Sequence, residues 1–171
     1  MVYVFFMISS LKTFFGFAKS NDATALYQAI VIAARNPTLY SQFSLKDTTE
    51  TRFELLTLHV FLVLHALRDR PETEKLKQHL FNTMVSDLDE NLREMGVGDM
   101  SIGKKVKGLA EIFYGRVKQY KEALENNTLE EELFKVFGVA NLAEYTIARL
   151  ARLESADTPT LPAILLNTQL S

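Results

Sequence analysis

The sequence of 171 residues contains no cysteine, and this absence excludes several kinds of site at once. Without thiols the chain cannot hold a disulfide scaffold, a cysteine-ligated zinc ion or an iron–sulfur cluster, and it has no cysteine nucleophile. Glycine and proline are also scarce, with seven and four residues. A fold of many short strands needs more of both at its turns, so the composition argues against such a fold.

Net charge is nearly absent as well. The chain has 19 basic and 21 acidic residues, a formal charge of −2, so no global positive field favours non-specific DNA binding. We expect no sequence-specific nucleic-acid binding. Hydrophobic residues make up 47% of the chain and charged residues 23%, which excludes intrinsic disorder. A chain of this length is typical of one domain with a substantial core.

The first 18 residues are strongly apolar, reading MVYVFFMISSLKTFFGFA, but they match no targeting signal. Positive charge does not precede the apolar stretch as in a secretory signal, and arginine is absent, unlike in a mitochondrial presequence. Two interpretations stay open: a helix packed on the core or on a neighbouring chain, and an interfacial helix in contact with a membrane. We therefore divide the chain into an apolar segment (1–20), a helical domain (21–155) and a C-terminal tail (156–171).

Hydrophobic spacing predicts an all-α fold in a single compact multi-helix domain. The predicted helices are 23–35, Thr48 or Thr49 to about Arg68, Pro71 to Gly96, Asp99 or Ser101 to Leu124, Thr128 to Phe137, and Asn141 to about Glu154. Thr128 to Glu131 has the pattern of a capping box. Residues 36–48 are expected to form a loop, and the tail is expected to be extended and to pack through Leu161, Ile164 and Leu165.

One predicted helix is apolar nearly all round. Its uncharged run, Leu55–Leu67, has 13 residues and contains His59 and His65. This is too short for a membrane span, which needs about 20 apolar residues. We therefore predict that this helix lies at the centre of the core.

No catalytic or metal-binding motif is present, so we expect a protein without enzymatic activity, metal or cofactor. None of the three histidines has the Glu-x-x-His or His-Glu-x-x-His spacing of helical metal sites, and each is interpreted as structural. Asp87, Glu90 and Glu94 share one side of a helix and are interpreted as a solvated face. Gly96-x-Gly98 follows a helix, unlike a nucleotide-binding loop, which follows a strand.

Residues 104–121 are strongly basic, with six Lys or Arg against Glu111 alone. Of these, Lys104, Lys107 and Lys118 can share a helix face. Either this is an ordinary solvated surface, or Lys104, Lys105, Lys107 and Lys118 contact an anionic surface such as ribosomal RNA, acidic lipid headgroups or an acidic partner. Aromatic side chains for stacking on bases are missing beside it, so base-specific RNA recognition is not expected.

Several strings resemble the ubiquinol–cytochrome c chaperone family. They include LREMGVGD (92–99) within the longer block 80–99, FYGR (113–116), and RFELLTLH (52–59) upstream. The likeness covers roughly residues 27–125. It implies an all-helical, non-enzymatic protein.

The resemblance also implies partners. Mitochondrial members of this family assist the synthesis and assembly of cytochrome b, together with a small partner protein near the ribosomal tunnel exit. The expected partners are therefore nascent cytochrome b, a small partner chaperone, the ribosome and the membrane surface. The expected location is the bacterial cytoplasm at the inner membrane, or the mitochondrial matrix side in a eukaryote.

The motif residues are the candidate site. Gly96 and Gly98 are expected to provide tight backbone geometry, and Asp99 a cap or turn. The charged members either form a buried ion-pair network that fixes helix register or contact the client; these are Arg52, Asp89, Arg93, Glu94 and Arg116. His59, Tyr114 and Gly115 complete the set of candidate client-binding or partner-binding residues.

Two other classes of function stay open. One is a binding module with a lipid or quinone held in a core cavity between the helices. The other is an enzyme whose site is assembled in a deep cleft from His59, Tyr114 and Arg116.

Overall fold

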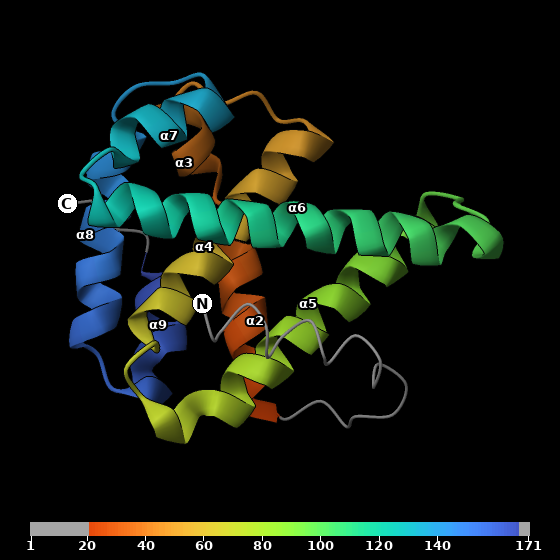
Figure 1. Cartoon of the computed structure of the whole chain (residues 1–171), viewed down its shortest axis with the longest axis horizontal. Helices are drawn as coiled ribbons and strands as arrows, with labels where there is room; N and C mark the ends of the chain where they lie inside the picture. Colours follow the sequence, from red (N-terminus) through yellow and green to blue (C-terminus); the bar gives the residue numbers. More distant parts are fainter. Residues whose placement is uncertain (1–20, 168–171) are drawn as a thin grey trace.

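The computed structural model describes residues 21–167, and every regular element in that range is helical (Figure 1). The order is α2 (Asn21–Ala34), α3 (Pro37–Gln42), α4 (Thr49–Ala66), α5 (Glu74–Glu94), α6 (Asp99–Glu125), α7 (Leu129–Phe137), α8 (Leu142–Ser155) and α9 (Leu161–Leu166), with short 3-10 turns at Pro71–Thr73 and Thr158–Thr160. The all-α prediction is confirmed. The apolar segment 1–20, for which two interpretations were open, lies outside the described residues.

Helix α4 is the centre of the core, as its apolar pattern predicts. Leu55, Leu58 and Leu62 are completely buried, and α4 contacts α2, α6, α7 and α8. Burial of each such leucine contributes roughly 1.5–3 kcal/mol to folding. No helix in the described part of the chain is long and apolar enough to cross a membrane.

Local signals set several helix ends. Thr48 is the cap of α4, because its Oγ1 accepts a hydrogen bond from the Thr51 amide at 3.1 Å. Gly96 follows the end of α5 with φ of +80°, a backbone conformation that favours glycine. Gly138 plays the same part after α7, with φ of +69°. These ends agree with the predicted ones.

Other predicted ends are corrected. The expected loop 36–48 contains α3, because Asn36 caps it by accepting from the Thr38 amide at 3.0 Å and Pro37 suits its first position. Neither Asp99 nor Ser101 caps α6: Gly98 holds the cap position, and the Asp99 carboxylate turns back to Arg93. At the start of α7, the Thr128 side chain makes no capping bond within the described residues.

The C-terminal tail is helical where we predicted an extended chain. Leu161 and Leu165 are completely buried on one side of α9, which lies against α2. Ile164 is partly buried. Pro162 falls in the first turn of α9, where proline's missing N–H costs nothing, so it does not prevent the helix. The tail therefore contributes to the core.

Helices α5 and α6 form a projecting hairpin, which we call the hairpin arm (residues 86–109). Figure 1 shows its tip extending beyond the other helices. Within the arm only Ile102 is buried, whereas the part of α5 before residue 86 has a continuous buried side. The family-like string 92–99 lies at the tip of this arm.

Candidate functional site

The tip of the hairpin arm brings together six of the candidate residues: Asp89, Arg93, Glu94, Gly96, Gly98 and Asp99. Arg93 joins the two helices, because its Nε donates to Asp89 Oδ2 at 2.7 Å and its Nη1 donates to Asp99 Oδ1 at 2.5 Å. The Arg93 side chain is 51% exposed. The charged motif residues therefore brace the turn at a solvated position.

The two glycines of the turn differ. Gly96 has a positive φ, which is the tight backbone geometry expected of this residue from the sequence. Gly98 has φ of −65°, and a Cβ added there would meet no atom within 4 Å. Gly115, in the middle of α6, is equally open. The expectation that Gly98 provides special backbone geometry is therefore corrected.

The expected buried ion-pair network is also corrected, because its members belong to separate pairs. Arg52 forms an exposed bidentate pair with Asp47, at 2.6 and 2.8 Å, and this hydrogen bonding lowers the pKa of Asp47. Glu94 is exposed at the arm tip. Only Arg116 forms a largely buried pair, in which Nε and Nη2 each donate to Glu54 of α4 at 2.9 Å.

These differences predict unequal mutational effects. Arg116→Ala is expected to destabilise the protein by about 2 kcal/mol or more, because it leaves the mostly buried Glu54 carboxylate unpaired. Arg93→Ala is expected to cost much less, because its ion pairs are exposed to solvent and screened by it. Urea unfolding of both variants measures the difference. Equal losses would contradict this assignment of roles.

Tyr114 is packed against other aromatic rings. Its ring centroid lies 5.4 Å from that of Phe81 in α5 and 5.7 Å from that of Phe113. Burial raises the pKa of Tyr114 to about 12, and its hydroxyl has no hydrogen-bond partner among the described residues. This side chain therefore contributes to packing between α5 and α6.

His59 is completely buried, and both of its ring nitrogens have partners. Nδ1 lies 2.8 Å from the Leu55 carbonyl oxygen and Nε2 lies 2.7 Å from the Tyr145 hydroxyl. Because a carbonyl can only accept, Nδ1 carries the proton and Nε2 accepts from Tyr145. Burial lowers the pKa of His59 to about 4, against the smaller raising effect of the Leu55 carbonyl. The structural interpretation of His59 is confirmed.

A series of hydrogen bonds continues from His59 to the tail. Arg149 donates to the Tyr145 hydroxyl at 3.4 Å, to the Ile164 carbonyl at 2.9 Å and to the Asn167 carbonyl at 3.0 Å. These hydrogen bonds thus link α4, α8 and α9. Sequence reasoning missed Tyr145 and Arg149, although their spacing of four residues places both on one side of α8.

The enzyme hypothesis required one cleft shared by His59, Tyr114 and Arg116. Their polar groups do not meet: His59 bonds to Leu55 and Tyr145, whereas Arg116 bonds to Glu54 and Gln119. In the described part of the chain, no three His, Asp or Glu side chains gather where they could hold a metal ion.

A groove of about 850 Å³ lies where the end of α3 meets the turn between α7 and α8. Its lining residues are Gln42, Phe43, Ser44, Val139, Ala140, Asn141, Glu144, Tyr145 and Ala148. The Phe43 and Tyr145 rings, 5.9 Å apart, give it an aromatic floor. The groove lies at the surface, unlike the core cavity that the lipid or quinone hypothesis requires. Its two sides are about a hundred residues apart in sequence.

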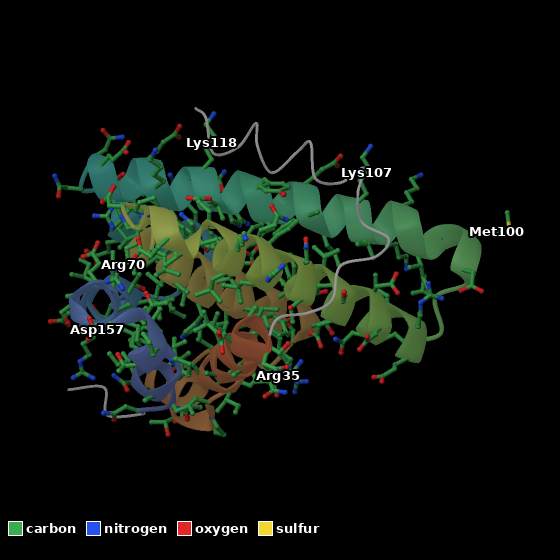
Figure 2. All side chains as sticks on the ribbon, turned by 90° about the horizontal axis from the view of Figure 1, so that it is seen from below. Arg35, Arg70, Met100, Lys107, Lys118 and Asp157 are labelled. Atoms are coloured by element: carbon green, nitrogen blue, oxygen red, sulfur yellow. The ribbon has the colours of Figure 1, made fainter. Side chains whose placement is uncertain are left out.

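The basic stretch of α6 is partly neutralised. Lys107, Lys118 and Lys121 each lie 3.8 Å from a glutamate four residues later, namely Glu111, Glu122 and Glu125. Lys104 and Lys105 are exposed and have no ion-pair partner among the described residues. Figure 2 shows Lys107 and Lys118 projecting from the same side of α6, as their spacing predicts. The uncompensated positive charge therefore lies toward the arm.

Comparison with known proteins identifies the family. The model of the ubiquinol-cytochrome C chaperone family matches residues 41–163, from the end of α3 into α9. The chain belongs to the ubiquinol-cytochrome C chaperone family. This is a family of assembly chaperones for ubiquinol–cytochrome c reductase, and the role its name describes is non-enzymatic. The resemblance noted in the sequence is thereby confirmed, and it extends to the tail.

Two relatives support this assignment. The crystal structure of the Cbp3 homolog from Brucella abortus is similar with a TM-score of 0.71 and 31% identity, covering 95% of this chain and 93% of that one. Ubiquinol-cytochrome-c reductase complex assembly factor 1 of Xenopus laevis is 22% identical over 103 residues, which are 60% of this chain. The match spans 52% of that relative, about half its length.

Proposed function

We propose that this chain binds newly made cytochrome b, without catalysis of its own, while ubiquinol–cytochrome c reductase is assembled. The observation that carries the proposal is the family match over residues 41–163, which includes every helix around α4 except α2. The resemblance of the sequence to family members that assist cytochrome b supports the choice of client.

The groove between α3 and the α7–α8 turn is our candidate for the client contact. A chaperone for a membrane subunit needs an apolar surface that can receive side chains of an unassembled transmembrane segment. Ala148 is exposed in the groove, and the Phe43 and Tyr145 rings, each 9% exposed, form its floor; the buried His59–Tyr145 hydrogen bond holds the Tyr145 ring in place. Preorganised walls lower the entropic cost of binding.

Exposed motif residues outside the groove are our candidates for contacts with the other expected partners. Arg52, Arg93, Glu94 and Asp99 all have solvent-exposed side chains, which a small partner chaperone or the ribosome can reach. His59 is too deeply buried for such a contact. We place the protein at the side of the membrane where cytochrome b is synthesised, in keeping with this client.

The proposal is tested in a strain that lacks the chain. We expect loss of assembled ubiquinol–cytochrome c reductase, measured from its cytochrome b absorbance, and rescue by the wild-type chain. Ala148→Arg, which places a long charged side chain in the groove, should fail to rescue. Ala151→Arg is the matched control, because Ala151 is exposed on α8 and does not line the groove.

The strain without the chain tests the assembly role, and the Ala148→Arg variant tests the groove as the client site. Normal reductase in the strain without the chain would contradict the assembly role. Rescue by a folded Ala148→Arg chain would contradict the groove as the client site.

A further inference from the structure

We propose that the groove recognises the basic end of an unassembled transmembrane segment, with Glu144 holding a Lys or Arg that flanks the apolar stretch. The assignment rests on the proposed function, since it names the part of the client that the groove receives. The groove lies where α3, α7 and α8 meet, away from the tip of the hairpin arm (Figure 1).

Glu144 gives the groove its charge. Of the described residues that line the groove, only Glu144 is charged, and it is exposed. Within residues 21–167 it forms no salt bridge, unlike Glu132 of the neighbouring helix α7, which is paired with Lys135 at 3.2 Å. Among these residues, therefore, nothing competes for its carboxylate with a positive group from another molecule.

The helices around the groove add to this negative charge. Residues 129–155, which include α7, α8 and the turn between them, contain five acidic and three basic side chains. One of the three bases, Arg149, is only 4% exposed and donates to carbonyl groups of the tail. On the other side of the groove, residues 37–48 contain one base, Lys46, and one acid, Asp47. The surroundings of the groove therefore favour a ligand of positive charge.

The start of α8 opposes this preference only in part. Asn141, which holds the cap position of α8, makes no capping bond through its side chain within the described residues. The free amides at a helix start carry about half a positive charge, which favours an anion. Glu144 is the third residue of α8 and places a full negative charge in the same turn. The sum of the two is negative.

The acidic and apolar parts of the groove are close together. Ala148 is exposed and follows Glu144 by four residues, so both lie on one side of α8 with their Cβ atoms about 5–6 Å apart. Val139 and Ala140 continue the apolar lining at the turn. A ligand that carries an apolar side chain and a positive charge at a similar separation can contact both parts at once.

Transmembrane segments have this chemistry at one of their ends. The loops that follow them on the cytoplasmic side are enriched in Lys and Arg, next to an apolar stretch of about 20 residues. The stems of these basic side chains are themselves apolar, so they can lie on Ala148 while the charged group reaches Glu144. A protein on the side of the membrane where the client is synthesised meets these basic ends.

The backbone on both sides of the groove has a fixed shape. Ser44 and Asn141, which line opposite sides, are non-glycine residues with positive φ, +52° and +68°. Such conformations persist where the surrounding structure determines them. Next to Ser44, the Leu45 amide donates to the Tyr40 carbonyl at 2.9 Å. A change of charge at Glu144 is therefore expected to alter affinity without rearranging the groove.

A charge swap between the groove and a peptide tests the proposal. The probes are two fluorescein-labelled peptides with the same stretch of alternating leucine and alanine, one followed by paired lysines and the other by paired glutamates. We expect the wild-type full chain to bind the lysine peptide about ten-fold more tightly, because Glu144 attracts one peptide and repels the other. Glu144→Lys should invert this preference. Fluorescence anisotropy at low salt, where screening is weak, measures both affinities.

Glu131→Lys is the matched control. Glu131 is the third residue of α7, as Glu144 is of α8, and it is also exposed, but it does not line the groove. The variant has the same net charge as Glu144→Lys and the same loss of an acid near a helix start. We expect it to keep the preference for the lysine peptide within about two-fold of wild type, because screening weakens charges outside the groove. Circular dichroism establishes that both variants are folded.

Four outcomes would overturn the proposal. These are equal affinity of the wild-type chain for the two peptides, binding of neither peptide, a wild-type preference for the glutamate peptide, and inversion of the preference by Glu131→Lys as well as by Glu144→Lys. The third would show that the start of α8, and not Glu144, sets the charge selectivity. None of the four decides the assembly role, which is tested separately by reductase levels in the strain without the chain.

Discussion

Acidification from pH 7 to pH 4 is expected to destabilise the protein, with about 3 kcal/mol of the loss due to His59. The folded state holds this buried imidazole neutral, with its pKa lowered to about 4, whereas the unfolded chain binds a proton near pH 6.5. Between these values the unfolded state takes up a proton that the folded state does not. Stability therefore falls as pH decreases through this window and levels off, for this group, below pH 4.

Urea unfolding at a series of pH values measures this effect. His59→Gln should remove most of the slope between pH 6.5 and pH 4, whereas His79→Gln, at a partly exposed position on α5, should keep it. The comparison of slopes separates His59 from carboxylates such as Asp47, which also lose stabilising interactions in acid. The same slope in the wild-type and His59→Gln chains would contradict the buried neutral histidine.

Leu161→Ala is expected to reduce the free energy of unfolding by about 2–5 kcal/mol, the usual cost of removing a fully buried leucine side chain. Leu161 lies on the buried side of α9, against the core. The matched control is Leu166→Ala on the same helix, whose side chain is 46% exposed and whose loss should cost at most about 1 kcal/mol.

Chemical denaturation of the two variants decides whether the tail belongs to the core. A loss for Leu161→Ala as small as that for Leu166→Ala would show that α9 contributes little to folding. In that case the hydrogen bonds from Arg149 to the end of α9 would also contribute little to stability, because they form only when α9 is packed on the core.

Local signals made much of the fold predictable. The apolar circumference of 55–67 identified α4 as the central helix, and Thr48 and Gly96 marked helix ends through chemistry that acts within a few residues. The same local view failed at Pro37 and Pro162. Proline reads as a helix breaker in a sequence, yet both residues lie in first turns, where their missing N–H is not needed.

The candidate site was predictable in part. The string 92–99 led to the family and to the arm tip, but it carried no sign that Arg93 would be exposed. Glu54 and Tyr145 were missed because their partners, Arg116 and His59, lie 62 and 86 residues away along the chain. Periodicity indicates which face of a helix is buried, but it does not identify the residue of another helix that contacts this face.

Capture of newly synthesised cytochrome b tests the central claim most directly. Membranes and ribosomes that are translating cytochrome b are pulse-labelled, the full chain is isolated through an affinity tag, and the labelled products are identified by mass spectrometry. The account predicts that cytochrome b is enriched over other membrane subunits made in the same pulse, and that Ala148→Arg reduces this enrichment while Ala151→Arg preserves it. Capture of all apolar subunits equally, or of none, would contradict it.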